Sequence, residues 1–204
     1  MQRLVIYALA IDDVRDIFGA DEALAERLRG AAAQHFAAAP TKKRWFGPVL
    51  RRDPDLVIDP ARPTTADAEA LLSGGYVAPE RQVACWRLLT LWFEELAAAY
   101  HEVSYDPANF DQIEWELACL GLGSENSLRS LAERRLGVPL QPLRGQIAGY
   151  AKHVHAVDVW QALTAVRKVP ELSEGAAVLI DPVIEALAAV ASLDRLDAVV
   201  VGSA

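Results

Sequence analysis

Apolar residues fall along this chain in two kinds of run, short continuous ones and longer ones with helical spacing. The segment "RLVIYALAI" (3–11) is rich in β-branched and aromatic residues and is too short for a typical helix. It therefore predicts a strand that is covered on both faces. "DAVVVG" (197–202) has the same character and predicts a terminal strand. A third strand is expected at "YAKHVHAV" (150–157), directly before a helical pattern.

Most of the remaining chain carries helical periodicity, bounded by capping residues, glycine and proline. The run at 79–103 starts with Pro79 and is apolar almost all round, which predicts the central core helix. Thr64 is the predicted N-terminal cap of a helix that a glycine pair stops. The expected helices cover residues 12–19, 21–39, 64–75, 79–103, 106–123, 124–137, 158–169 and 180–193.

The order of these elements predicts the fold class. Strands and helices do not alternate as a regular βαβ series, so we expect an α+β fold, predominantly helical, with a small sheet that includes the N-terminal and C-terminal strands. A chain of 204 residues with 52% hydrophobic content is long enough for one good core. We therefore expect a single domain over residues 1–204.

The charge balance narrows the expected partners. The chain has 28 acidic and 20 basic side chains, which gives a formal net charge of −8. This charge opposes attraction to phosphate backbones and to anionic membranes, so neither nucleic acid nor a membrane is an expected partner. A basic protein is the expected partner, because long-range attraction raises the rate of association with a positive surface.

Cysteine usage and the N-terminal segment favour the cytoplasm. Cys85 and Cys119 lie in apolar runs, where a thiol usually behaves as a small buried hydrophobe, and their spacing fits neither a disulfide framework nor a zinc finger. Asp12 and Asp13 interrupt the first apolar run where a signal peptide would need small residues. No run approaches the roughly 20 apolar residues of a membrane span.

The segment "AKHVHAVDVW" (151–160) is the first candidate for chemistry. In an extended strand His153 and His155 would point to the same face, and Asp158 could add an oxygen ligand for a transition metal. A comparison with "IYALAIDDVRDIF" favours a structural role, because both segments run from Tyr-Ala into Asp-Val at the start of a helical pattern. Asp13 and Asp158 are then expected to cap helix N-termini. No metal or cofactor is expected on this interpretation.

Carboxylates cluster in and after the predicted core helix. A pair of them could act as acid and base, but carboxylates on the outer faces of amphipathic helices are usually solvated. The same residues could form an acidic helical face that docks on a basic partner. His101, close to them in sequence, is expected to interact with the C-terminal dipole of the core helix. The carboxylates are Glu94, Glu95, Glu102, Asp111, Glu114 and Glu116.

The proline-rich segment 40–63 is expected to form a long loop. It combines cations with aromatic rings, the mixture that phosphate and nucleic-acid sites use. The net negative charge of the whole chain favours a solvated loop instead of such a binding site. If a surface loop binds a ligand, this basic loop is the first candidate, with Lys42, Lys43, Arg44, Trp45, Arg51 and Arg52.

The chain lacks a Walker loop, a Rossmann glycine fingerprint, a GxSxG elbow, an HExxH helix and an EF-hand loop. "IYALAIDDVRDIFG", "YAKHVHAVDVWQALTAVRKV" and "LDAVVVG", in this order, resemble segments of small bacterial proteins of the YfbM-like kind and their actinobacterial relatives. "LLSGGYVAPERQVACWRLLTLWFEELA" is similar to a short helix and core helix in some of them. The resemblance covers about half of the chain.

This resemblance implies an α+β domain with a small sheet and packed helices, and no catalytic residues to transfer. Some proteins of this sort look like components of toxin and immunity gene sets. The leading hypothesis is therefore a non-enzymatic, protein-binding, immunity-type factor that uses the acidic face. The alternatives are a metal-dependent hydrolase that uses His153, His155 and Asp158, and phosphate or RNA recognition by the basic loop.

Overall fold

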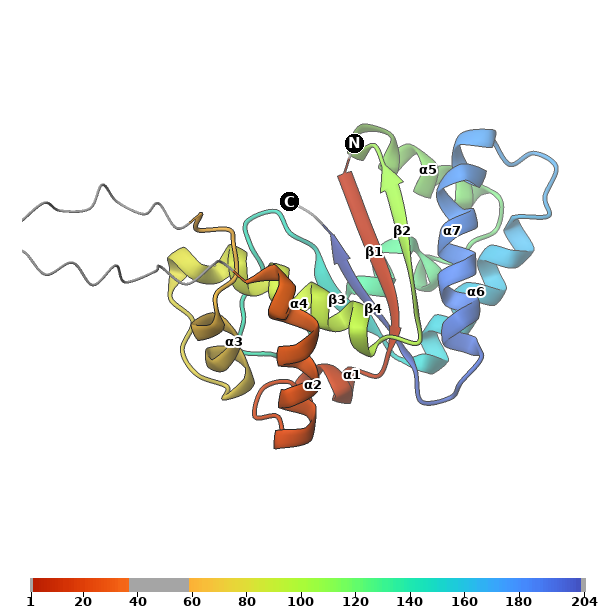
Figure 1. Ribbon diagram of the computed structural model, residues 1–204. Coiled ribbons are helices and arrows are strands. Elements are labelled where there is room, and N and C mark those ends of the chain that lie inside the picture. Colours follow the sequence, from red (N-terminus) through yellow and green to blue (C-terminus); the bar gives the residue numbers. More distant parts are fainter. Residues whose placement is uncertain (1, 37–58, 203–204) are drawn as a thin grey trace, which may run out of the picture.

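A four-stranded antiparallel sheet forms the centre of the molecule. The computed structural model describes residues 2–36 and 59–202, and its strand order is β2-β1-β4-β3 (Figure 1). The central strand β1 pairs with both β2 and β4, so the N-terminal and C-terminal strands lie side by side. The predicted α+β class is confirmed. The strands are β1 (Gln2–Leu9), β2 (Ala99–Tyr105), β3 (Ala148–Ala151) and β4 (Asp197–Gly202).

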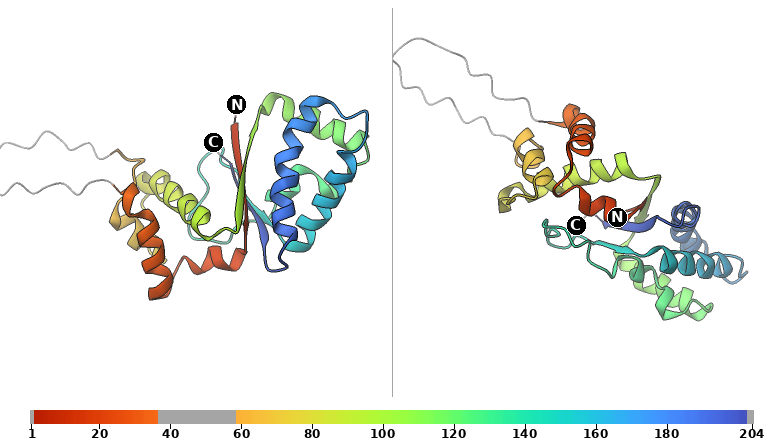
Figure 2. Two further views of the ribbon diagram at one scale, coloured as in Figure 1. Left: turned by 45° about the vertical axis from the view of Figure 1, so that its right-hand side comes forward. Right: turned by 90° about the horizontal axis from the view of Figure 1, so that it is seen from below.

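Helices cover both faces of this sheet and make three layers (Figures 1 and 2). One face carries α1 (Ile11–Asp16), α2 (Glu22–Ala32), α3 (Thr65–Leu72) and α4 (Gln82–Leu96). The other face carries α5 (Pro107–Cys119), α6 (His153–Val166) and α7 (Glu174–Ala191). Short 3-10 turns connect them: η1 (Ala33–His35), η2 (Pro79–Arg81), η3 (Ser124–Asn126) and η4 (Leu128–Ala132).

The alternation of side chains along β1 divides the interior into two cores. Tyr7 and Leu9 pack against the α1 to α4 layer, whereas Ile6 and Ala8 pack against the α5 to α7 layer. All four are almost fully buried. The continuous apolar run was therefore correctly predicted to be a strand covered on both faces. Within the described helices, none is long and apolar enough to cross a membrane.

The core helix is shorter than predicted, and a strand follows it. Helix α4 buries Trp92 and Phe93 and ends at Leu96, and residues 99–105 form β2 against β1. No glycine or proline separates helix from strand in this segment, so local sequence did not mark the boundary. His101 consequently lies on β2, with its Nδ1 atom 3.6 Å from Glu185 of α7, and the prediction that it interacts with a helix dipole is wrong.

Three other boundaries differ from the prediction. Strand β3 ends at Ala151 and α6 begins at His153, so only the first two residues of the predicted strand 150–157 are in a strand. The segment 124–137 contains the 3-10 turns η3 and η4 instead of an α-helix. The last helix starts six residues earlier than expected, where Ser173 accepts a hydrogen bond from Ala176 N, and Pro182 lies inside the helix.

The predicted cap at Thr64 is confirmed as a capping box with Asp67. Arg81 binds the same carboxylate through two nitrogens, at 3.0 and 2.6 Å. Burial opposes ionisation of Asp67, but hydrogen bonds from Arg81 and Thr64 outweigh it and lower the pKa of this carboxyl. This buried pair ties α3 to the start of α4.

The two thiols differ in environment. Cys85 is buried, as expected, and burial together with nearby Asp67 raises its pKa to about 11, so it stays protonated at neutral pH. Cys119 is exposed at the end of α5, which contradicts the expectation that both thiols lie in the core. Leu117, two residues earlier on α5, is the residue of this apolar run that is fully buried.

Candidate functional site

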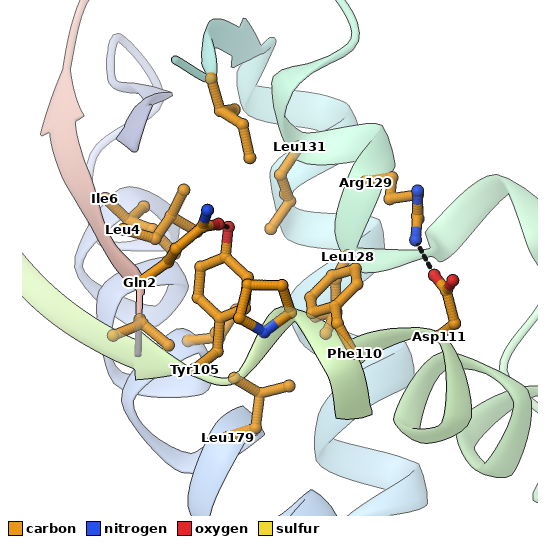
Figure 3. A pocket seen from close by; sticks show the side chains of 14 residues that line it. Gln2, Leu4, Ile6, Tyr105, Phe110, Asp111, Leu128, Arg129, Leu131 and Leu179 are labelled. Atoms are coloured by element: carbon orange, nitrogen blue, oxygen red, sulfur yellow. Dashed lines mark hydrogen bonds and ion pairs between the residues drawn. The ribbon is translucent and has the colours of Figure 1, made fainter. Parts of the chain in front are cut away.

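An apolar cavity of about 310 Å³ lies between the sheet and the layer of α5 and α7 (Figure 3). Its wall is made by strands β1 and β2, the first turn of α5, the turn η4 and the side of α7. Figure 3 shows these side chains converging from segments far apart in the sequence. Most of them are aliphatic or aromatic: Leu4, Ile6, Val103, Tyr105, Pro107, Phe110, Leu128, Leu131, Ile147, Leu179 and Val183.

Strand and helix periodicities place these side chains. Leu4 pairs with Val103 and Gln2 pairs with Tyr105 across the β1–β2 ladder, so all four point to the α7 side. Opposite them, Leu179 and Val183 are four residues apart on α7 and share one face of that helix. The cavity thus follows from the same alternation that divides the two cores.

One polar pair lies in this apolar wall. The Tyr105 hydroxyl donates a hydrogen bond to the Gln2 side-chain carbonyl at 2.8 Å, and the two groups face each other in Figure 3. Among the described residues, the Gln2 amide N–H2 group has no hydrogen-bond partner. The Tyr105 ring packs against Phe110, with 5.4 Å between centroids. A ligand could therefore accept from Gln2 or donate to Tyr105.

Charges lie at the edge of the cavity and not inside it. Arg129 forms ion pairs with Asp111 and with Glu114, the latter at 2.6 Å, and its guanidinium lies 5.1 Å from the centroid of the Phe110 ring (Figure 3). Two carboxylates paired with one guanidinium give the edge of the cavity a small net negative charge. A charged ligand would lose its hydration inside without a counter-ion, so the cavity suits a neutral molecule.

The histidine pair does not share a face, because its segment is helical. His153 Nδ1 lies 3.1 Å from the Leu196 carbonyl oxygen, whereas His155 Nε2 lies 2.9 Å from Ser130 Oγ. Asp158 lies further along α6. The strand on which the metal hypothesis depended is absent, and the described residues contain no group of three or more His, Cys, Asp or Glu side chains that could hold a metal ion.

Asp197 at the start of β4 caps two helices. Its carboxylate accepts hydrogen bonds from Ile11 N of α1 at 3.0 Å and from His153 N of α6 at 2.9 Å. Lys152 Nζ lies 3.4 Å from the same carboxylate. Asp13 does lie in the first turn of α1, where a carboxylate complements the helix dipole, but the N-cap position is Ala10. The predicted cap Asp158 is wrong, since this residue lies in the interior of α6. The similarity of the two segments does reflect a shared position: both helices begin beside Asp197.

The predicted acidic residues lie on both sides of the sheet. Glu94 and Glu95 are on α4, Glu102 is on β2, and the other three are on α5. Most are held by partners in the protein. Glu95 binds Arg27, Glu102 binds Arg3, Asp111 and Glu114 bind Arg129, and Glu116 accepts from the backbone and hydroxyl of Ser173.

The predicted basic loop falls in 37–58 and lies outside the described residues. Its residues are Lys42, Lys43, Arg44, Trp45, Arg51 and Arg52.

The residues that line the apolar cavity were not anticipated from the sequence, because two walls of this cavity, β2 and η4, were predicted to be helical. The alternation of Gln2, Leu4 and Ile6 was the available signal.

No family model, no curated protein and no solved structure matches this chain. The resemblance to the YfbM-like kind stays a prediction.

Proposed function

We propose that this protein is a non-enzymatic binding protein whose cavity receives a neutral, mostly apolar small molecule. The observation that carries the proposal is the combination of a mostly aliphatic and aromatic wall with one neutral polar pair, Tyr105 and Gln2, and the Asp111–Arg129 ion pair at its edge. Small-molecule sites typically have this composition, with a few polar groups that orient the ligand. Among the described residues that line this cavity, there is no serine, threonine, cysteine or histidine.

The cavity volume sets the size of the ligand. An engineered apolar cavity of about 150 Å³ is large enough to bind benzene. At about 310 Å³, the cavity between β1, β2 and α7 has room for a bicyclic ring system. The expected ligand is thus a neutral molecule of one or two rings, or an aliphatic chain of similar volume, with one hydroxyl or carbonyl group.

A series of three related probes tests the proposal. We expect 1-naphthol to bind saturably, with shifts of the methyl NMR signals of Leu179 and Val183. We expect naphthalene, which lacks the hydroxyl, to bind about fivefold to tenfold more weakly, because a neutral hydrogen bond contributes about 1 kcal/mol. We expect 1-naphthoate to bind weakest, because its carboxylate would be desolvated.

Two variants localise this binding. Tyr105→Phe removes the hydroxyl while retaining the ring, and should reduce the preference for 1-naphthol over naphthalene. Val183→Phe should fill part of the cavity and abolish binding of both probes. The matched control Val178→Phe lies on an exposed part of α7 and should bind as the wild type does. Unsaturable shifts, or equal binding by Val183→Phe, would contradict the proposal.

A second candidate function, docking on a basic protein, is favoured by Trp115. This side chain is 71% exposed on α5, an unusual state for so large an apolar group. Asp111 lies one turn before it on the same outer face. Exposed tryptophans are frequent anchors of protein interfaces. This candidate function therefore keeps only the part of the predicted acidic face that lies on α5.

For this candidate, Trp115→Ala should release a partner that the wild-type protein retains at low salt. Val178→Ala, which removes another exposed apolar side chain, should retain it. Asp111→Asn should weaken retention and flatten its dependence on salt. The measurement is quantitative co-purification from a bacterial lysate, and equal retention by Trp115→Ala and Val178→Ala would remove α5 as the interface.

A further inference from the structure

A second cavity, of about 580 Å³, lies on the opposite face of the sheet. It is bounded by β1, α4, the end of β4 and the segment 143–146. Its wall differs from that of the first cavity because it contains polar and charged side chains as well as Val5, Trp86 and Leu143. Those polar residues are Arg3, Tyr7, Arg87, Thr90, Glu94 and Gln146.

The Tyr7 hydroxyl is the most informative group in this wall. Tyr7 is only 1% exposed, and its ring packs between Phe93 and Tyr100, at centroid distances of 5.5 and 5.9 Å. Its side chain points from β1 toward α4 and lines the cavity. Across residues 2–36 and 59–202, no hydrogen bond is formed by this hydroxyl, and the one buried side-chain polar atom without a partner there is Thr164 Oγ1. The Tyr7 hydroxyl is therefore open to the solvent of the cavity, where a ligand acceptor could replace water.

Burial, and then the charge of Glu94, raise the pKa of Tyr7. The hydroxyl therefore stays protonated at neutral pH and is available as a donor. The charge of Arg3 acts in the opposite direction but does not outweigh these two causes, and both Arg3 and Glu94 line the cavity.

Two opposite charges on α4, Arg87 and Glu94, line the same cavity as this hydroxyl. Val83, Arg87, Thr90 and Glu94 recur at spacings of three and four residues and form one stripe along the cavity. Arg87 and Glu94 are two turns apart, about 10 Å along the helix axis. Neither forms an ion pair within the described part of the chain; Arg87 Nη1 donates to the Ala61 carbonyl at 3.0 Å.

We propose that this cavity binds a zwitterionic ligand of dipeptide size. The ligand carboxylate lies at Arg87, its ammonium group at Glu94, and a central carbonyl accepts a hydrogen bond from Tyr7. Two extended residues span about 7 Å, which leaves room for a hydrogen bond to each flexible side chain. A ligand with one charge would satisfy only one end of the stripe. The proposal concerns the opposite face from the apolar cavity and does not depend on the function proposed there.

The test uses L-alanyl-L-leucine with two matched derivatives. NMR titration of the full chain should show saturable shifts of the backbone signals of Tyr7, Thr90 and Gln146. The N-acetylated dipeptide lacks the ammonium group and the C-amidated dipeptide lacks the carboxylate. Each should bind about tenfold more weakly, because a hydrogen bond to a charged group contributes about twice as much as a neutral one.

Three variants assign the ends of the ligand. Arg87→Gln should equalise the parent and amidated dipeptides, and Glu94→Gln should equalise the parent and acetylated ones. Tyr7→Phe retains the packed ring and should weaken all three peptides alike. Glu26→Gln removes an exposed carboxylate on α2 and should change nothing. Absence of saturable shifts, or equal affinity of the three peptides for the wild type, would overturn the proposal.

Discussion

Replacement of Gly149 by alanine is expected to lower the free energy of unfolding by about 3 kcal/mol or more. Gly149 is in β3 and faces the turn η4. A Cβ atom at this position would lie 2.1 Å from the Ala132 carbonyl oxygen and 2.8 Å from that of Arg134. Both obstacles are backbone atoms, so a change of side-chain rotamer cannot relieve the clash.

The clash would also break a hydrogen bond. Tyr150 N donates to the Arg134 carbonyl at 2.9 Å, which extends the sheet edge beyond β3. Displacing the chain around Ala132 to accommodate alanine would separate these groups. Because η4 also carries Leu128 and Leu131 into the apolar cavity, we expect Gly149→Ala to weaken 1-naphthol binding as well.

Gly30→Ala is the matched control for this prediction. Gly30 lies inside α2, and a Cβ atom there would meet nothing within 4 Å. Because alanine is the better helix former by up to about 1 kcal/mol, this variant should be slightly more stable than the wild type. Urea unfolding, followed by tryptophan fluorescence, measures both effects. Equal stability of the two variants would show that η4 does not pack closely on β3.

The elements correctly predicted from the sequence are those whose signals are local. The apolar runs of β1 and β4 and the capping box at Thr64 are encoded within a few residues. Strand β2 was missed because it continues the apolar run of α4 without a break and its residues have opposing preferences, Tyr100 for a strand and Glu102 for a helix. Pairing with β1, about a hundred residues away, decides their conformation.

The candidate sites were harder to predict because their residues meet only in the folded chain. The apolar cavity joins Gln2, Tyr105, Leu128 and Leu179, which come from four separate elements. In the second cavity, the spacing of Arg87 and Glu94 on one helix was visible, but the sheet decides that Tyr7 lines the same cavity. Sequence proximity instead grouped carboxylates that lie on opposite faces.

The second large effect is expected at Asp197. Asp197→Ala should lower the free energy of unfolding by roughly 4 kcal/mol, because two helix N-termini lose their shared acceptor. The N–H group of Ile11 would then lack a partner at a buried site, and that of His153 at a partly buried one. Lys152 is partly exposed, so its ammonium group can be rehydrated, and its ion pair contributes less.

Two further variants separate the contributions of the cap. Asp197→Asn keeps one acceptor oxygen and should lose about half as much stability as Asp197→Ala, because one of the two N–H groups keeps a partner. Asp194→Ala, three residues earlier and fully exposed, should stay within about 0.5 kcal/mol of the wild type. The same urea unfolding measures all three. If Asp197→Ala were as stable as Asp194→Ala, the shared cap would not determine where α1 and α6 begin, and the helical start at His153 would need another explanation.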